Sequence, residues 1–394
     1  MKKLLSMLVI GTLVVSMAGC GKTSDTGNVS KETSVTEKEN SGASGETQIL
    51  NMGMVLCLTG DAAVVGGAQR DGFSLGMEAV EESLGDSVKI DVAIEDHQGT
   101  NDLAITAINK LVNMDNCQLV VGSFSGPTQV MAPIAEENEV VLMNPGAQAD
   151  ALTGLSDYLF TTVPATMYSA EAMADFVYNE LGLSTASIIC VQSGTAAAES
   201  DDFAIAFKEV GGTILSTEYI EADETDYSSH CAKVKQENPE FILLSCSTDS
   251  VSTQVLTQLN EIGMTEIAIG SLGITPSAKF NEGMSNPVYL ANVKTYMDEA
   301  VMSAYEEKYG SEMNVHAANM YNAALITGQA VSYCLDNNLE LTGKNLHDAL
   351  EAIGTFDIMG GTLALDLEDH SSASPIEILD ATNCVNEPVK TYFE

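Results

Sequence analysis

Short apolar runs that alternate with helical segments constrain the fold of this chain more than any other feature of its sequence. After residue 48 the runs read ILNMGMVLCL, VKIDVAIED, CQLVVG, VVLMN and YLFTTVP. The segments between them, such as RDGFSLGMEAVEESL and NDLAITAINKLVNM, carry apolar residues at helical spacing. Strands of roughly four to eight residues that alternate with helices of roughly ten to fifteen are typical of βαβ units. Because the runs are almost continuously apolar, as in strands covered on both faces, they predict a parallel α/β sheet.

The same alternation begins again after YLFTTVP, with the runs SIICV, TILSTEYI, FILLSCS and EIAIGSL. Two further helical segments follow, and the last part, FDIMGGTLALDLEDHSSASPIEILDATN, is typical of a β-hairpin. The sequence therefore predicts two doubly wound parallel-sheet domains. We expect residues 49–163 and 292–355 to form one lobe and residues 164–291 and 356–394 to form the other. Three chain crossings, near 162–166, 289–294 and 354–357, are expected to join the lobes as a hinge.

The first residues predict export and a lipid anchor. A basic start, MKK, precedes the apolar run LLSMLVIGTLVVSM and the triplet Ala18-Gly19-Cys20. The run has the length of a signal-peptide core and is short for a membrane span. We therefore expect residues 1–19 to be a lipoprotein signal peptide and Cys20 to become the lipid-modified N-terminus at the extracytoplasmic face of the cell membrane. An ordinary cleaved signal with a coincidental cysteine remains the alternative.

Residues 20–48, which begin with this cysteine, are rich in Ser, Thr, Gly, Glu and Lys. Such a composition buries too little apolar surface to offset the entropy of ordering, so this segment is predicted to be a flexible linker.

The charge of the chain excludes one class of partner. Its 16 basic and 56 acidic residues give a net charge of −40, which repels phosphate backbones and argues against nucleic-acid binding.

Motifs for catalysis, cofactors and metals are absent from the sequence. The stretch GSFSG resembles a nucleophile elbow, but its central residue is Phe124, and no phosphate-binding glycine motif occurs. The five histidines show no metal-ligand spacing. Apart from Cys20, the seven cysteines are widely spaced and contain no C-x-x-C pair, which predicts buried free thiols. We therefore expect a protein that is not an enzyme and has no cofactor and no metal ion.

The turn GSFSGPTQ marks a candidate ligand site. In open parallel sheets, ligands bind beyond the carboxyl ends of the strands, and this turn follows a predicted strand directly. Ser125-Gly126-Pro127 suits the start of a helix, whose free N–H groups favour an anion. The alternative is that the serine only caps the helix.

The order of these elements resembles a known family, the type I periplasmic binding proteins, and in particular branched-chain-amino-acid-type substrate-binding lipoproteins of ABC transporters. The resemblance covers most of residues 49–394 and is strongest in VVGSFSGPTQVMAPIAEENEVVLMNPGAQADAL. It implies a two-lobed Venus-flytrap fold. It also implies that hydroxyl and N–H groups at Ser123, Ser125, Gly146 and Gln148 hold the carboxylate of the ligand.

The sequence departs from the family's amino-acid-binding pattern at several positions. Gln148 stands where members usually have a hydroxyl, and Ser271-Leu272-Gly273 stands where they have an acidic residue that holds the ligand's ammonium group. Asp249 and Glu199 are the substitute candidates for that role, with a solvated loop acid as the alternative for each. Leu58, Thr59 and Tyr321 are expected to line the apolar side of the cleft, although packing within its own helix accounts equally well for Tyr321.

The resemblance implies a monomeric solute-binding lipoprotein that captures a small polar solute, an amino acid or a related carboxylate or amide, and delivers it to an ABC permease. Two other functions stay open at this point. The same protein could present its bound solute to a membrane receptor as a sensor, or it could be a surface hydrolase. The sequence does not identify the solute.

Overall fold

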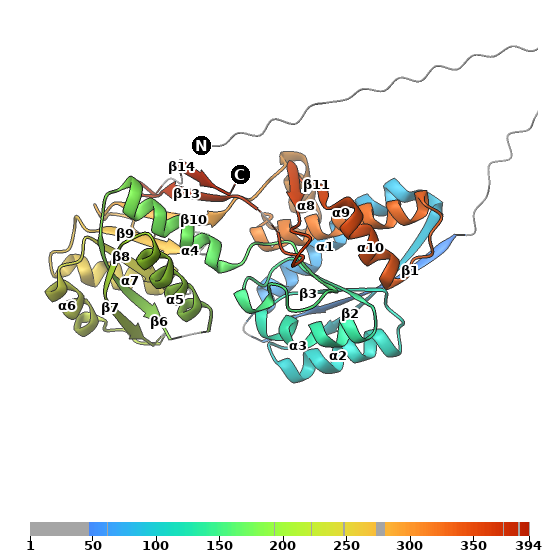
Figure 1. The fold of residues 1–394 in the computed structure, drawn as a ribbon, viewed down its shortest axis with the longest axis horizontal. Coiled ribbons are helices and arrows are strands. Elements are labelled where there is room, and N and C mark those ends of the chain that lie inside the picture. The colour runs from blue at the N-terminus through green and yellow to red at the C-terminus, as the bar shows by residue number, and fades with distance from the viewer. Residues whose placement is uncertain are drawn as a thin grey trace, which may run out of the picture. The chain divides into compact units, whose positions relative to one another are not determined.

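Two sheets rich in parallel strands form the framework of the computed structural model (Figure 1). It describes residues 47–60, 62–192, 194–221, 223–246, 249–272, 280–372, 374–384 and 387–393. The predicted signal peptide, Cys20 and nearly all of the predicted linker lie outside these residues. Within the described ranges, no helix has both the length and the apolar character that crossing a membrane requires.

The first sheet has five strands in the order β2-β1-β3-β4-β5, and all of them run parallel. The strands are β1 (Gln48–Leu56), β2 (Val88–Asp96), β3 (Leu119–Gly122), β4 (Val141–Asn144) and β5 (Leu159–Thr161). Every residue of β3, β4 and β5 is buried, which confirms the prediction of strands covered on both faces.

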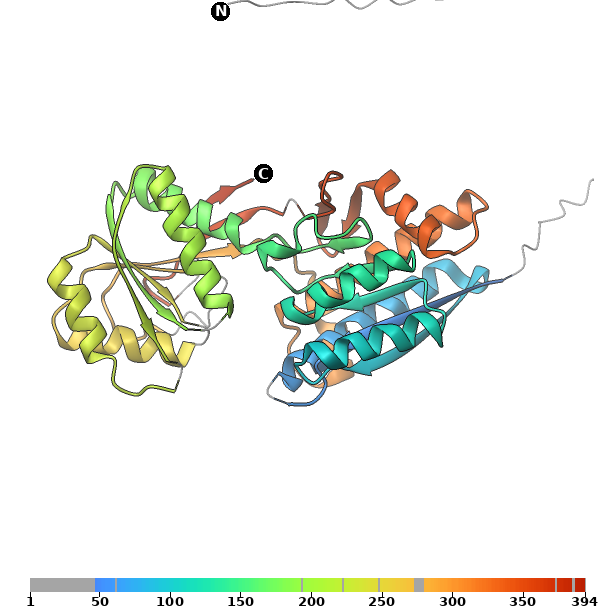
Figure 2. The same ribbon diagram turned by 60° about the horizontal axis from the view of Figure 1, so that its bottom comes forward.

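Helices cover both faces of this sheet. They are α1 (Ala63–Leu84), α2 (Asn101–Asn113), α3 (Ser125–Glu137), α9 (Val315–Asp336) and α10 (Gly343–Ile353). A further helix, α8 (Glu299–Tyr309), packs on α1 and α9. Alternate residues of β1 separate the two faces, since Met54 packs in a cluster with α1, α9 and α10, while Val55 packs with α2 and α3. Figure 2 brings α2 and α3, drawn in teal, to the front.

Helices α1 and α9 pack closely because α1 presents glycines to its neighbour. A Cβ atom at Gly72 would overlap with the backbone carbonyl of Ala317, and one at Gly76 would lie 2.6 Å from Ala324 Cβ. The absence of a side chain at these two positions is therefore what lets the helices approach. This contact matters for the site, because α9 begins there.

The second sheet has the order β14-β13-β10-β9-β8-β6-β7. Its strands are β6 (Thr185–Val191), β7 (Thr213–Ile220), β8 (Phe241–Ser245), β9 (Ala268–Leu272), β10 (Val288–Val293), β13 (Ile376–Asp380) and β14 (Glu387–Tyr392). Strands β6 to β10 pair in parallel, whereas β13 and β14 are antiparallel additions at one edge. Its helices are α4 (Thr166–Asp175), α5 (Gly194–Glu209), α6 (Ser228–Glu237) and α7 (Asp249–Glu261).

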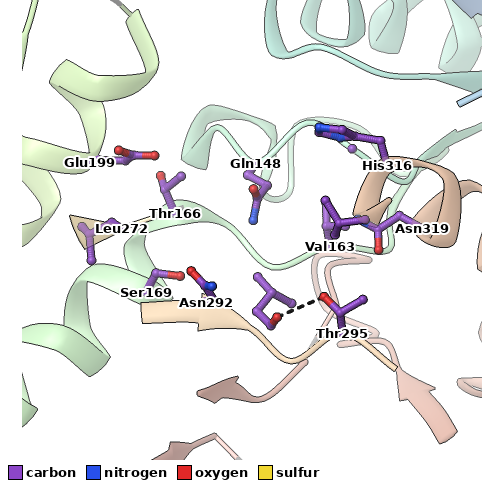
Figure 3. Close-up of a pocket in the computed structure, with 13 residues that line it drawn as sticks. Gln148, Val163, Thr166, Ser169, Glu199, Leu272, Asn292, Thr295, His316 and Asn319 are labelled. Atoms are coloured by element: carbon purple, nitrogen blue, oxygen red, sulfur yellow. Dashed lines mark hydrogen bonds between the residues drawn. The ribbon is translucent and has the colours of Figure 1, made fainter. Parts of the chain in front are cut away.

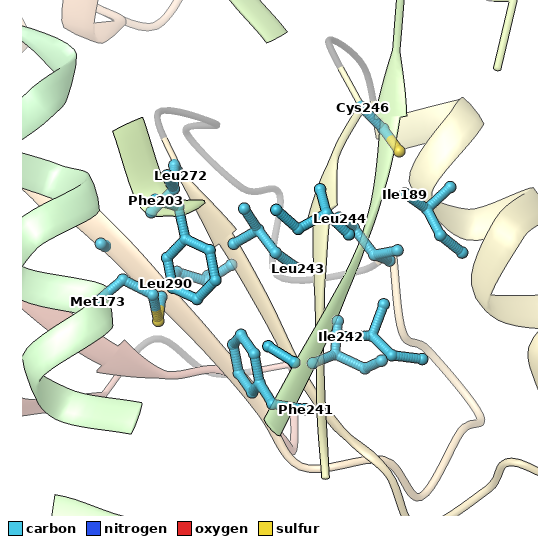
Figure 4. Packing of buried hydrophobic residues seen from close by; sticks show 14 of the residues in the cluster. Met173, Ile189, Phe203, Phe241, Ile242, Leu243, Leu244, Cys246, Leu272 and Leu290 are labelled. Atoms are coloured by element: carbon cyan, nitrogen blue, oxygen red, sulfur yellow. The ribbon is translucent and has the colours of Figure 1, made fainter. Parts of the chain in front are cut away.

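The core of the second sheet is a single apolar cluster (Figure 4). Every residue of β8 is buried, and Phe241 packs at a ring-centroid distance of 5.9 Å from Phe203 of α5. The fold class predicted from the sequence, an α/β protein with two parallel-rich sheets, is thus confirmed.

The chain returns to the second sheet later than the sequence suggested. Residues 355–364 form a small hairpin, β11 (Thr355–Ile358) and β12 (Gly361–Ala364). Phe356 and Leu363 of this hairpin pack in the core of the first sheet. The sequence predicts that residues 356–394 belong to the second lobe, whereas the strands of the second sheet resume at β13. The reason is that the apolar face of the hairpin is buried against α9 and its neighbours.

The seven cysteines of the described residues are free thiols, and all except the half-buried Cys384 are buried. Burial raises the pKa of Cys117 and of Cys190 to about 11. A thiol with such a pKa stays protonated near neutral pH and packs as a small apolar group. This matches the prediction from their spacing.

Candidate functional site

A pocket of about 110 Å³ lies among residues that follow the strand ends of both sheets (Figure 3). The first sheet supplies Gly146 and Gln148 from the loop after β4, and the second supplies Leu272 at the end of β9 and Asn292 on β10. Three helices add residues from their first two turns: Thr166 and Ser169 of α4, Glu199 of α5, and Val315, His316 and Asn319 of α9. Val163, Val293 and Thr295 complete the lining. The volume suits a small organic molecule, and the position agrees with the rule that ligands bind beyond the carboxyl ends of parallel strands.

The loop that carries Gly146 and Gln148 is shaped by one buried side chain. Asn144, the last residue of β4, donates from Nδ2 to the carbonyl of Ala147 at 2.8 Å. Its Oδ1 accepts from the N–H groups of Gly146 at 3.3 Å and of Ala147 at 2.8 Å. Gln148 donates from Nε2 to the carbonyl of Pro164 at 3.0 Å. This network turns the loop toward the pocket and also engages the Gly146 N–H.

Ser123 and Ser125, which the sequence predicted as ligand-binding residues, are not among the residues that line the pocket. Ser123 is buried directly against Gly146, where a Cβ atom would overlap with the serine Oγ. Gln69 of α1 donates from Nε2 to this Oγ at 2.6 Å. Ser125 begins α3, but the N-cap residue is Phe124, and no side chain caps the helix. Ser123 thus supports the Gly146 loop from behind.

The turn GSFSGPTQ contains a strained residue that sequence reasoning missed. Phe124 has φ +76°, in the left-handed region that a bulky side chain rarely adopts. Its ring packs edge-on against His97 at a centroid distance of 5.5 Å. Strain of this kind persists only where the surrounding packing enforces it, and it gathers at binding sites.

Glu199 is the one carboxylate among the lining residues. Its side chain is buried, and Ser245 Oγ lies 2.9 Å from its Oε2 and also 2.9 Å from the carbonyl of Ala196. The single hydroxyl hydrogen of Ser245 can satisfy only one of these two acceptors. A proton on Glu199 resolves the conflict, because the carboxyl group then donates to Ser245, which donates to Ala196. Burial correspondingly raises the pKa of Glu199 to about 7.

Two further acids, Asp150 and Asp202, lie beside the pocket residue Thr166. Thr166 Oγ1 is 3.3 Å from Asp150 Oδ1 and 3.2 Å from Asp202 Oδ2. Burial and the neighbouring Asp150 raise the pKa of Asp202 above its usual value. Asp150 also accepts from the N–H of Met167 at 3.2 Å. Thr166 therefore links the connection between β4 and β5 to helices α4 and α5.

The remaining predicted residues lie elsewhere or are not described. Leu58 donates its N–H to Asp96 at 2.9 Å, and Thr59 donates its hydroxyl to the same carboxylate at 2.6 Å. Tyr321 packs in an apolar cluster with Tyr305 and other side chains of α8 and α9, which agrees with the packing interpretation. None of the three is among the residues that line the pocket. The side chain of Asp249 lies outside the described residues.

Sequence reasoning missed two groups of lining residues. The first lies on chain crossings, at Val163, Thr166, Asn292 and Thr295. The second is the start of α9, where burial lowers the pKa of His316 and favours its neutral form. The first group could have been found from the sequence, because the predicted crossings 162–166 and 289–294 contain three of these four residues.

Two parallel-rich sheets with a small pocket lined from both define a solute-binding fold. The chain belongs to the periplasmic binding protein family, whose model matches residues 50–383. This is a family of binding proteins that catalyse no reaction.

Among its relatives is "Leu/Ile/Val-binding protein homolog 3" of Brucella melitensis, which is 25% identical over 248 residues. That alignment covers 61% of this chain and spans 63% of the length of the relative. The solved branched-chain amino acid transporter substrate-binding protein of Streptococcus pneumoniae, in complex with isoleucine, superposes with a TM-score of 0.70 at 20% identity and covers 87% of this chain and all of its own. A solute-binding protein of R. palustris in complex with benzoate has a TM-score of 0.69 at 17% identity, covering 87% of this chain and 96% of its own. These structures share the fold of the chain.

Proposed function

We propose that this protein is an extracytoplasmic solute-binding lipoprotein of an ABC transporter, which captures a small amine-bearing carboxylate of the amino-acid type in the pocket and delivers it to a permease. The observation that carries the proposal is the pocket itself. It is small, it is lined by residues of both sheets, and it contains one buried carboxylate, Glu199, but no lysine or arginine.

The two ends of the pocket suit the two charged ends of such a solute. Figure 3 shows Glu199 on one side and His316 with Asn319 on the other, with Gln148 between them. An ammonium group beside Glu199 would give this buried acid the cationic partner that it lacks among the described ion pairs. Amide and imidazole groups, together with the N-terminal end of α9, favour a carboxylate at the opposite side.

A second class of solute is a carboxylate without an amine. One observation favours it: because its pKa is raised to about 7, Glu199 is neutral at slightly acidic pH. A neutral carboxyl group does not repel the carboxylate of such a solute, whereas the ionised form does. The R. palustris relative solved with benzoate shows that the fold accommodates such a ligand in another protein.

Native mass spectrometry of the purified protein, followed by calorimetric titration with free amino acids and with benzoate-type carboxylates, tests the proposal. We expect saturable binding of one amino-acid-type molecule per chain. If benzoate-type carboxylates bind and no amine-bearing solute does, the second class of solute is correct. If neither binds and no small molecule co-purifies, the proposal is wrong.

Solute binding is also expected to bring the two sheets closer together. Chain crossings connect them, and the pocket takes residues from both, so a bound solute stabilises the closed arrangement. Small-angle scattering with and without saturating solute should show a smaller radius of gyration in its presence, and the melting temperature should rise by mass action. An unchanged radius at full saturation would contradict closure, while leaving solute binding intact.

The lipid anchor has its own test. Because Cys20 follows a signal-peptide core and two small residues, Cys20→Ala should prevent lipid attachment. We expect the variant protein either to leave the membrane fraction or to remain as an unprocessed precursor. Cys384→Ala, which removes a half-buried thiol far along the chain, is the matched control and should fractionate as the wild type does. A Cys20→Ala protein that matures and stays with the membrane contradicts the anchor.

A further inference from the structure

Two histidines that are 23 residues apart in sequence come together against β5. His347 lies on α10, and His370 lies in the segment that follows β12. Their rings are 5.4 Å apart, and both pack on Phe160, with His370 stacked on it at 4.3 Å. Both side chains are buried, with exposed fractions of 8% and 3%. This pair is remote in sequence from the residues that line the pocket, and none of those residues belongs to it.

Carboxylates converge on the two imidazoles. One potential ligand atom each from Asp157, His347 and His370 lies within 4.8 Å of the other two. Nε2 of His347 is 3.1 Å from the backbone carbonyl oxygen of Asp157 and 3.8 Å from its Oδ2, so a bound ion would take the place of the contact with the carbonyl. Glu351 Oε1 is 3.3 Å from Nε2 of His370. Two imidazoles that bind one tetrahedral ion at 2.0–2.1 Å have ring centres roughly 5 Å apart, which agrees with the observed separation.

The hydrogen bonding of His370 leaves one ring nitrogen without a partner. Glu351 faces Nε2, whereas Nδ1 is buried and has no hydrogen-bond partner among the described residues. In metal sites, a histidine commonly binds the ion through one nitrogen and donates from the other to a carboxylate. The charges at this place also favour a bound cation. Among the described residues, Asp157 and Glu351 have histidines as their sole ion-pair partners, with no lysine or arginine.

We propose that Asp157, His347 and His370 form a binding site for a divalent transition-metal ion of the zinc class, with solvent as the fourth ligand. Two imidazoles and a carboxylate are a donor set that Zn²⁺ accepts and that Ca²⁺ and Mg²⁺, which prefer oxygen ligands, do not. Asp157 has an exposed side chain, with 69% of its surface accessible, so the ion can enter from solvent.

The position of the site gives it a structural consequence. The N–H of Thr161 in β5 donates to the carbonyl of His370 at 2.9 Å, and Thr161 pairs with Ser371 in a parallel bridge. A metal ion bound by Asp157, His347 and His370 would join three segments: the start of β5, α10 and the chain that leads to β13. Zinc binding should therefore stabilise the fold and hold this crossing segment in place.

The test uses the full-length protein, stripped of metals with a chelator and returned to metal-free buffer. Equilibrium dialysis against Zn²⁺ should give about one ion per chain, and Zn²⁺ should raise the melting temperature in a way that EDTA reverses. Co²⁺ in the same site should show the visible absorption of a tetrahedral complex. We expect His347→Gln and His370→Gln to weaken Zn²⁺ binding about a hundredfold and Asp157→Asn about tenfold.

His230→Gln is the matched control, since His230 also lies beside two carboxylates, Glu218 and Glu224, but has no second histidine. It should bind Zn²⁺ as the wild type does. If a histidine variant fails to fold, Asp157→Asn still tests the proposal, because the exposed side chain of Asp157 can be changed without disturbing the core. The proposal is overturned if the wild type binds no stoichiometric Zn²⁺, or if Asp157→Asn and the folded histidine variants bind it with unchanged affinity.

Discussion

Replacing Glu199 with glutamine is expected to weaken the binding of an amine-bearing solute by about two to three and a half orders of magnitude. The variant keeps the shape of the side chain and its contact with Ser245 but removes the negative charge that faces the pocket. Breaking a buried charge pair costs about 3–5 kcal/mol, which corresponds to such a change in the dissociation constant. Calorimetric titration at pH 8, where Glu199 of the wild type is ionised, measures the effect.

The pH dependence of binding identifies the solute independently. Because the pKa of Glu199 is raised to about 7, the affinity for an ammonium-bearing solute should fall by about tenfold for each pH unit below 7. A carboxylate without an amine requires the protonated form, so its affinity should fall above pH 7 instead. Wild-type affinity in the glutamine variant, together with binding that strengthens as the pH falls, would rule out the ammonium role of Glu199.

The same substitution should stabilise the ligand-free protein at alkaline pH. The pKa of Glu199 is 4.5 in the reference state and about 7 in the folded protein, so the folded protein holds this proton more tightly. The resulting stabilisation is complete below pH 4.5 and is lost as the pH rises through 7. Above that pH, the buried charge costs about 3 kcal/mol, which Glu199→Gln removes. Glu209→Gln, at an exposed position of the same helix, should leave the free energy of unfolding nearly unchanged in denaturant titrations at pH 8.

The second large effect is expected at Gly72 of α1. In Gly72→Ala the new Cβ atom would overlap with the backbone carbonyl of Ala317, which cannot rotate away as a side chain can. Overpacking of this kind costs about 1–3 kcal/mol, and we expect the upper end of that range. Because Val315, His316 and Asn319 lie within the same turns of α9, solute affinity should fall together with stability.

Gly67→Ala is the matched control on the same helix. Apart from the backbone of its own helix, no atom lies within 4 Å of the Cβ position at Gly67, so alanine should raise the free energy of unfolding by about 0.5–1 kcal/mol through its higher helix propensity. Chemical denaturation of the two variants should therefore shift in opposite directions. Equal stability of Gly72→Ala and the wild type would show that α9 moves to accept the methyl group.

The fold could be predicted because its signal is local. The buried strands β3, β4 and β8 are continuous apolar runs, and the helices between them show their period within a single window. The late return of the chain to the second sheet could not be predicted in this way. Hairpin sequences show which residues pair, but the packing of Phe356 under α9 depends on contacts between distant segments.

Three residues that line the candidate pocket could be named from the sequence. Gly146 and Gln148 follow from the family resemblance together with the strand ends, and Glu199 follows from the departure from the family pattern. Ser123 carries the sequence signal of a ligand-binding residue, but Gln69 engages its hydroxyl group behind the loop. The pair of His347 and His370 gives no signal in the sequence, because only the folded hairpin between them brings their rings together.

Four of the residues that line the pocket also belong to the segments that connect the two sheets. Val163 and Thr166 lie at the passage from β5 to α4, and Asn292 and Thr295 lie at the passage from β10 toward α8. A substitution that alters which solute is accepted therefore also alters the stiffness of a connecting segment. As the members of such a family diverge in sequence, solute selectivity and the stiffness of the connecting segments would therefore change together. A designer who grafts a new specificity onto this scaffold would have to re-optimise the kinetics of solute release in the same step.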